Sequence, residues 1–330
     1  MGPKIRVVIG FIVSVFFIWA LFKQVDNLGN TIAALRNANY VYVIPALVAY
    51  FIGVWLRAAR WHFLLLPVKS IKTSTLFPIV VIGYMANNVL PTRLGEVYRA
   101  YVLGEQEGVP KATSLASIIV ERMFDGIAML LFVAIVGFLV PLDDEFSGIV
   151  RVATVLFVLA LGTMVIAVST GHRVISLIHR FEGRLPTAFH GKIVNVTGRF
   201  LEGLGSLRSV RLAGSILGLS LAAWICEATM YYTVGLGFHL QLGFEAGLLT
   251  TAFANLAAMV PAAPGNFGTF EIGAKTALNL FKVDSDQSVA YVGVLHLVLW
   301  APVTILGFIY LWRANLSLRL LSQRTTSSVT

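Results

Sequence analysis

The residues best suited to chemistry lie in the stretch ANNVLPTRLGEVYR (86–99), which interrupts an otherwise apolar part of the chain. A proline and Gly95 break the backbone there, and Arg93, Glu96 and Arg99 follow at spacings that place them on one helix face. Guanidinium groups bind phosphate through paired hydrogen bonds. Ionisable residues at membrane depth are costly and generally functional. The stretch therefore favours a polar binding site at a broken helix; a cytoplasmic loop with a surface ladder of ion pairs is the alternative.

A second interruption, MVPAAPGNFGTFE at 259–271, has the same ingredients as the first. In each, an apolar lead-in precedes a proline, a glycine and a glutamate that opens an apolar helix. The N-terminal amides of such a helix point into the break, where they favour a phosphate. Discontinuous helices in corresponding halves of a chain are typical of inverted-repeat transporters with a site near the midplane. We therefore expect the two breaks to meet, with Asn88 before the first proline and with Pro264, Gly265, Gly268 and Glu271 in the second break.

A third group of charges, Glu121, Arg122 and Asp125, lies between the two breaks in SLASIIVERMFDGIAMLL. On a helix, Glu121 and Asp125 share a face, and Arg122 is spaced to pair with Asp125. One interpretation is an ordinary helix-end cluster in which Arg122 extends to the interface. The other is that Arg122 and Arg93 together recognise a phosphate, while the acids hold the guanidinium groups in place.

Glu227 stands alone in a long apolar segment that contains AAWICEATMYY. A lone carboxylate in a membrane is either protonated and structural or a proton carrier, and the sequence leaves both open. Glu227 and Glu96 are accordingly the candidates for ion coupling. Lys275, one turn beyond Glu271, is spaced to pair with that glutamate.

The composition is that of a membrane protein: 57% of the 330 residues are apolar, 12% are charged, and the mean hydropathy is +0.82. This predicts an all-α polytopic protein of the cell membrane. The net charge of +9 then reflects orientation and contact with anionic lipid, and no binding of nucleic acid is expected. The single cysteine, Cys226, excludes an internal disulfide, and we expect neither a metal nor a cofactor. No P-loop motif is present, so ATP drive is not expected.

Two apolar segments, Leu76–Pro91 and Ala246–Pro261, run into the breaks. The expected architecture is therefore six crossings plus two re-entrant hairpins arranged as an inverted repeat, or eight crossings if both broken segments span. One membrane domain is expected at 1–312, with a polar cytoplasmic tail at 313–330. The six segments long enough to cross a bilayer are Ile5–Phe22, Tyr40–Leu56, Gly126–Pro141, Ile149–Ser169, Leu212–Gly237 and Val289–Trp312.

Basic residues set the expected orientation of the chain. Positive charge concentrates in the loops at 57–75 and 172–211, which places both of these loops and both termini on the cytoplasmic side. Within RAARWHF, Arg57 and Arg60 are interpreted as anchors at the membrane interface.

Three blocks of the sequence, NNVLPTRLGEVYRAYVL, ASIIVERMFDGIAML and VPAAPGNFGTFE, resemble the signature blocks of the lysylphosphatidylglycerol synthase/flippase transmembrane family. The resemblance covers nearly the whole chain. It implies a helical domain with re-entrant segments that moves lipids or lipid-linked molecules between leaflets. Two-domain members of that family add a soluble aminoacyl-transferase domain, whereas this chain ends soon after Trp312, so the synthase activity is not carried over. The residues that match motif positions are Asn88, Arg93, Gly95, Glu96, Glu121, Arg122, Asp125, Pro264, Gly265, Gly268 and Glu271.

The leading functional hypothesis is a flippase or transporter for a phospholipid or a lipid-linked molecule. An enzyme acting on lipid headgroups is a second class, but no Ser/His/Asp or multi-histidine group falls near either break, although His239 and His296 lie in or beside late spans. A third class is a membrane partner of a lipid-modifying or glycosyl-transfer enzyme. Assembly into a homo-oligomer is left open by the sequence.

Overall fold

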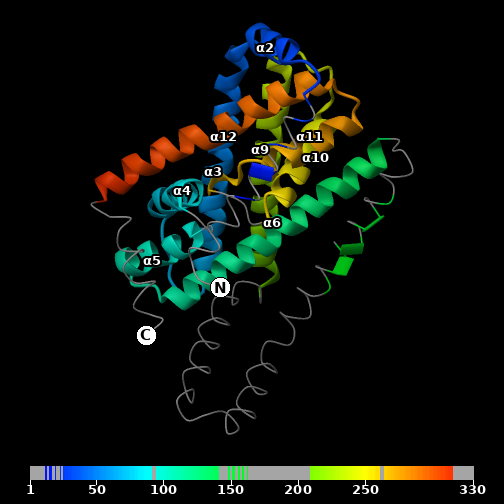
Figure 1. The fold of residues 1–330 in the computed structure, drawn as a ribbon. Helices are drawn as coiled ribbons and strands as arrows, with labels where there is room; N and C mark the ends of the chain where they lie inside the picture. The colour runs from blue at the N-terminus through cyan, green and yellow to red at the C-terminus, as the bar shows by residue number, and fades with distance from the viewer. Residues whose placement is uncertain are drawn as a thin grey trace.

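A computed structural model describes residues 25–90, 94–140, 209–260 and 264–314, together with isolated residues between 12 and 23 and between 148 and 162. In these parts of the chain every element is helical, as the apolar composition predicts, and Figure 1 shows their arrangement. The elements are α2 (Leu28–Asn37), η1 (Tyr40–Tyr42), α3 (Val43–Leu65), α4 (Thr73–Val89), α5 (Gly95–Glu107), α6 (Lys111–Leu139), α9 (Val210–Gly237), α10 (Phe244–Ala257), η5 (Pro264–Asn266), α11 (Thr269–Leu280) and α12 (Ser285–Arg313).

Four helical segments are long and apolar enough to cross a membrane: Tyr40–Leu65, Lys111–Leu139, Val210–Gly237 and Ser285–Arg313. Each contains one of the predicted spans or nearly all of it, but α6 begins well before Gly126 because no proline interrupts the sequence from 111 onward. The charged cluster of α6 therefore lies inside a long apolar helix and not at its end. The other two predicted spans, near the N-terminus and after residue 148, fall almost entirely outside the described residues.

The same succession of helices occurs twice in the described chain. A long helix, a short helix, a break, a short helix and a long helix follow one another in α3–α6, with lengths of 23, 17, 13 and 29 residues. The same order recurs in α9–α12, with lengths of 28, 14, 12 and 29 residues. Each half thus contains one helical hairpin, α4–α5 or α10–α11, that turns at its break.

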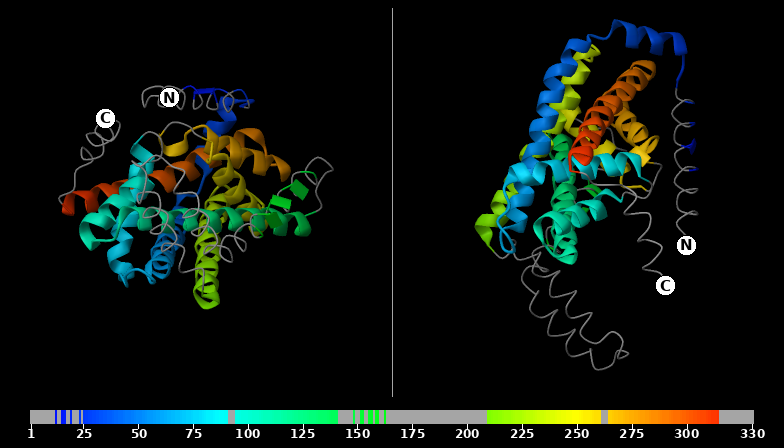
Figure 2. Two further views of the ribbon diagram at one scale, coloured as in Figure 1. Left: turned by 90° about the horizontal axis from the view of Figure 1, so that it is seen from below. Right: turned by 90° about the vertical axis from the view of Figure 1, so that its left-hand side faces the viewer.

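The helices α3 and α9 pack side by side and run antiparallel (Figure 2). At one end the backbone amide of Asn39 donates to the carbonyl of Gly237 at 2.8 Å, and further along Arg60 donates to Ser220 at 2.9 Å. The two hairpins pack against this pair of helices, α4 against α3 and α10 against α9.

The two hairpins approach from opposite ends of the α3–α9 pair. The outer end of α4–α5 lies beside the last residues of α3, where Lys69 bonds Glu107 at 2.8 Å. The opposite end of the bundle holds the start of α12, where Gln287 bonds the carbonyl of Phe238 at 2.8 Å, and α11 leads directly into that turn. In Figure 1, α5 accordingly lies at the end of the bundle away from α2, and α11 lies nearer to it.

Local sequence explains why each hairpin turns where it does. Leu90 is extended, as expected for the end of a helix shortly before a proline, whereas the second break holds Gly265, Asn266 and Gly268 at φ values of 77°, 60° and 91°. Only residues that tolerate the left-handed region fit such a path. In the first hairpin the two helices pack closely at Gly95, where an added Cβ would lie 2.1 Å from the carbonyl oxygen of Gly83.

Candidate functional site

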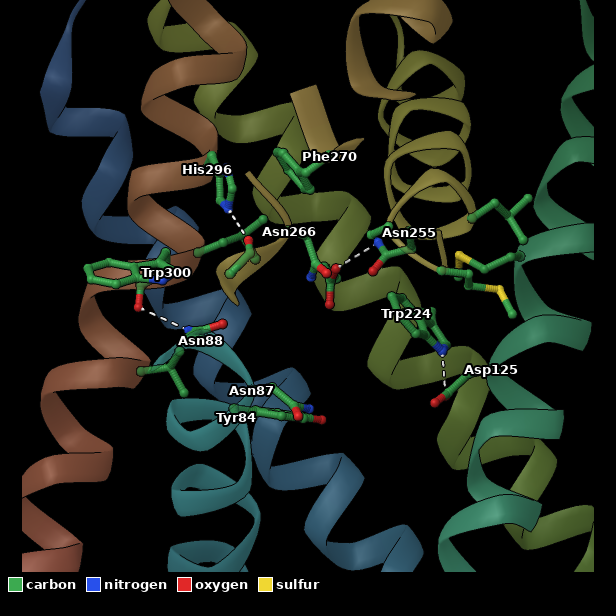
Figure 3. Close-up of a pocket in the computed structure, with 18 of the residues that line it drawn as sticks. Tyr84, Asn87, Asn88, Asp125, Trp224, Asn255, Asn266, Phe270, His296 and Trp300 are labelled. Carbon is green, nitrogen blue, oxygen red and sulfur yellow. Dashed lines mark hydrogen bonds between the residues drawn. The ribbon is translucent and has the colours of Figure 1, made fainter. Parts of the chain in front are cut away.

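A cavity of about 440 Å³ lies where the two hairpins meet inside the bundle (Figure 3). Its wall combines aromatic rings with side-chain amides and charges, drawn from both halves of the chain. The amides are those of Asn87, Asn88, Asn255 and Asn266, and the charged residues are Arg57, Glu96, Arg122, Asp125 and Glu227.

Both breaks contribute to this wall, as the sequence predicts. Asn88 and Glu96 reach it from the first hairpin, and Gly265 reaches it from the second. The helix α4 packs directly against η5, and Asn88 donates to the hydroxyl of Thr304 on α12 at 2.8 Å. Arg93, with the proline before it, lies outside the described residues, so its predicted place beside a phosphate stays a prediction.

Glu121 on α6 is the centre of a buried ionic network. Arg99 binds it through both guanidinium nitrogens, at 2.9 and 3.1 Å, and Arg60 approaches it at 3.3 Å. The Arg99 guanidinium also lies 4.2 Å from the ring centre of Trp61. Because Glu121 and Arg99 are themselves buried and do not line the cavity, their contact holds α5 and α6 together.

The predicted grouping of Glu96 and Arg99 on one face is therefore only partly correct. Glu96 lines the cavity, whereas Arg99 is buried and runs across Gly83, where an added Cβ would lie 2.4 Å from the arginine side chain. Positions three apart differ by about 60° around a helix. That difference, with the long arginine side chain, lets α5 present one charge to the cavity and the other to α6.

Arg122 and Asp125 carry the network to the cavity wall. Arg122 contacts Glu121 at 2.8 Å and Asp125 at 3.4 Å, which confirms the pairing expected from their spacing. Asp125 also accepts from Arg60 at 2.6 Å and from the Trp224 indole at 2.8 Å. The network thus joins three guanidinium groups to two carboxylates, and the excess positive charge reaches the cavity at Arg122, whose side chain is 45% exposed.

Glu227 is not the isolated carboxylate that its sequence context indicates. Arg57 donates to it at 2.6 Å, Asn255 donates at 3.1 Å, and the Arg57 guanidinium lies 4.4 Å from the ring centre of Trp224. Arg57 and Arg60 are consequently buried site residues of α3, and their interpretation as interfacial anchors is wrong. Two arginines spaced three apart on an apolar helix were a sequence signal for a buried site. Their acidic partners lie on α6 and α9, so the sequence alone did not reveal the pairs.

The second break is held by Glu271 and His296. One carboxylate oxygen of Glu271 accepts from the amide of Gly268 at 2.7 Å, and the other contacts Nδ1 of His296 at 2.5 Å. Lys275 donates to Ser285 at 2.6 Å, and its expected pairing with Glu271 stays a prediction. Sequence reasoning placed His296 in a late span but did not assign it or Asn87 to the site; an imidazole in a long apolar helix was the signal for His296.

The remaining predicted residues of the second break shape its backbone. Pro264 begins η5, Gly265 lines the cavity, and Gly268 caps α11 through its contact with Glu271. In the described parts of the chain, no group of three or more histidine, cysteine or acidic side chains is placed to hold a metal ion.

Four long apolar helices, a polar cavity between two broken hairpins and a buried ionic network define a polytopic helical membrane protein. Residues 7–307 match the family model described as the lysylphosphatidylglycerol synthase TM region, and the chain belongs to this family.

Similar proteins come from archaea. A UPF0104 membrane protein of Methanothermobacter thermautotrophicus is 26% identical over 91% of each chain. The UPF0104 membrane protein MJ1595 of Methanocaldococcus jannaschii is 32% identical over 39% of each chain. Glycosyltransferase AglD of Haloferax volcanii is 27% identical over 82% of this chain, which spans 48% of that protein's length. No solved structure matches the chain.

Proposed function

We propose that this protein moves a phospholipid or a lipid-linked molecule between the leaflets of the cell membrane. The observation that carries the proposal is the meeting of two broken hairpins, which approach from opposite ends of the bundle, at one polar cavity. Broken helices with opposed entry, arranged as inverted repeats around a central site, are the architecture of secondary transporters. The family membership agrees with a role in the membrane.

The cavity wall suits a charged headgroup. The excess positive charge of the buried network reaches the cavity at Arg122, where a guanidinium can bind a phosphate through paired hydrogen bonds. The Nδ2 groups of Asn88 and Asn255 donate within the protein, so their amide oxygens are left as acceptors for hydroxyl or amine groups of the headgroup. Met259 lines the cavity and is 66% exposed, and we propose that the acyl chains leave the cavity beside it and stay in the bilayer.

The hairpins supply the means for access from both sides. With both termini cytoplasmic, α4–α5 enters from the cytoplasmic face and α10–α11 from the opposite face as re-entrant segments. Alternating movements of the two hairpins would then expose one headgroup site to each leaflet in turn. Arg93 lies outside the described residues, and we propose it from its place in the sequence as a second guanidinium for this site.

The test is leaflet exchange of headgroup-labelled phospholipid in liposomes, comparing wild type with Arg122→Gln at equal reconstitution. Losing a charged hydrogen-bond donor should slow exchange by at least about tenfold. The matched control is Arg36→Gln, because Arg36 is an exposed arginine on α2, away from the cavity. Exchange no faster than in empty liposomes, across several lipid classes, would reject the transporter.

A second candidate function is a membrane partner of a glycosyl-transfer enzyme, or such an enzyme itself. The similarity to the Haloferax glycosyltransferase over 82% of this chain favours this candidate. Co-purification with an enzyme that modifies lipid headgroups, without lipid exchange by the isolated protein, would support it.

A further inference from the structure

His296 on α12 is buried, and its side chain lies near Asn266 and Phe270 of the second break (Figure 3). Its Nδ1 lies 2.5 Å from a carboxylate oxygen of Glu271, and its Nε2 lies 2.9 Å from the carbonyl oxygen of Gly265. The rings of Phe267 and Phe270 lie on it with centroid distances of 4.6 and 4.5 Å. One side chain of α12 thus contacts both Gly265, within the break, and Glu271, in the first turn of α11.

The two contacts of His296 require a definite number of protons on the imidazole and the carboxyl group. A carbonyl oxygen and an ionised carboxylate only accept hydrogen bonds, and a neutral imidazole has a single N–H to donate. Both contacts of His296 are hydrogen bonds only if the His296–Glu271 pair carries one further proton, on the imidazole or on the carboxyl group. The other oxygen of Glu271 already accepts from Gly268.

Loss of that proton would leave a neutral imidazole and a carboxylate, with the proton released to the cavity that His296 lines. One of the two contacts then places an acceptor against an acceptor, so either Gly265 or Glu271 is released from α12. The protonated pair therefore locks the break to α12, and the deprotonated pair frees it.

The other charged groups around the cavity already have partners of their own. Glu227 is paired with Arg57, and Asp125 is held by Arg60 and Arg122. Neither carboxylate therefore stands alone in the cavity wall. Further titratable side chains on the elements around His296 include Tyr50 on α3, Tyr84 on α4, Glu96 on α5, Tyr231 on α9, Lys275 on α11 and Tyr291 on α12.

We propose that His296 and Glu271 form a proton-binding site that locks the second break to α12, and that proton release frees residues 265–268 to move. This inference rests on the proposed lipid transport and makes that transport depend on protons. Transport should be slow when the His296–Glu271 pair is protonated and fast when the proton is lost. The proton-binding site itself is a property of the protein that can be measured without any lipid movement.

Hydrogen–deuterium exchange of the reconstituted full-length protein tests the lock directly. In wild type, protection of residues 264–271, corrected for the intrinsic effect of pH, should fall at least about tenfold between about pH 6 and about pH 8.5. The first hairpin is the internal control, because its break is held by the Asn87 amide and not by a histidine. Equal protection of 264–271 at both pH values would overturn the proposal.

Two variants separate a proton site from a merely structural contact. In Glu271→Gln, the new amide can donate to Nδ1 of a neutral His296 while its oxygen still accepts from Gly268, so the break should stay locked at both pH values. In His296→Gln, one amide cannot reach both partners, so the break should stay mobile at both pH values. If Glu271→Gln loosened the break instead, the pair would be structural and the proposal would fail.

Lipid exchange in liposomes at the same two pH values then distinguishes the two proposals. Wild type should exchange lipid faster at the higher pH. Glu271→Gln should exchange lipid slowly at both pH values, and His296→Gln should exchange it at a rate that does not depend on pH. A pH-dependent lock with no lipid exchange would reject the transporter and retain the proton site. Lipid exchange with pH-independent protection of residues 264–271 would retain the transporter and reject the proton site.

Discussion

Arg57 and Glu227 lie 170 residues apart in the chain, yet their side chains meet at 2.6 Å between α3 and α9. Both are buried in the bundle, and Glu227 is also bonded by Asn255 of the second hairpin. A pair of this kind lets two charges remain inside a membrane protein, since each compensates the other. It also ties the α3–α9 axis to the hairpin that forms half of the cavity.

Removing one partner of this ion pair should lower the stability of the protein. Glu227→Ala leaves the Arg57 guanidinium buried without its carboxylate, and we expect the free energy of unfolding to fall by about 3–5 kcal/mol. The double variant Arg57→Met/Glu227→Leu removes both charges and should recover most of that loss. Denaturant unfolding in detergent measures both; a double variant as unstable as the single one would contradict this account.

The bidentate contact of Arg99 with Glu121 should not tolerate lysine. Arg99→Lys keeps the charge but loses the paired hydrogen bonds and the stacking on Trp61, so we expect a loss of about 1.5–3 kcal/mol in unfolding free energy. Lys111→Ala, which removes an exposed ion pair with Glu105, is the control and should cost less than about 1 kcal/mol. Equal losses in the two variants would show that burial of the network contributes little.

The crossing of α4 and α5 should require glycine. A Cβ at Gly95 would lie 2.1 Å from the backbone of Gly83, so Gly95→Ala must push the two helices apart and should lower stability by about 1–3 kcal/mol. Gly218→Ala on α9 meets nothing within 4 Å and should be neutral or stabilising. Thermal unfolding of the two variants compares them; a stable Gly95→Ala would mean that the hairpin is not closely packed.

Several features of this protein follow from interactions between residues that are close together in the sequence. Hydropathy over long segments predicts the four helices that can span a membrane, and Pro and Gly residues locate the two breaks, because both effects act within a few neighbouring residues. The motif blocks around Glu96, Glu121 and Glu271 likewise predict the family, to which the chain belongs. The pairing of Arg122 with Asp125 follows from helix geometry alone.

Only the tertiary structure decided which charges meet. Arg60 binds Asp125 across 65 residues of sequence, and His296 contacts the carbonyl oxygen of Gly265, 31 residues before it. Helical periodicity states which side chains share a face, but it does not state which helices become neighbours. The partners of Arg57, Arg99 and Glu271 therefore depended on the packing of the two hairpins against α3, α6 and α12, which determines where each buried charge finds its compensation.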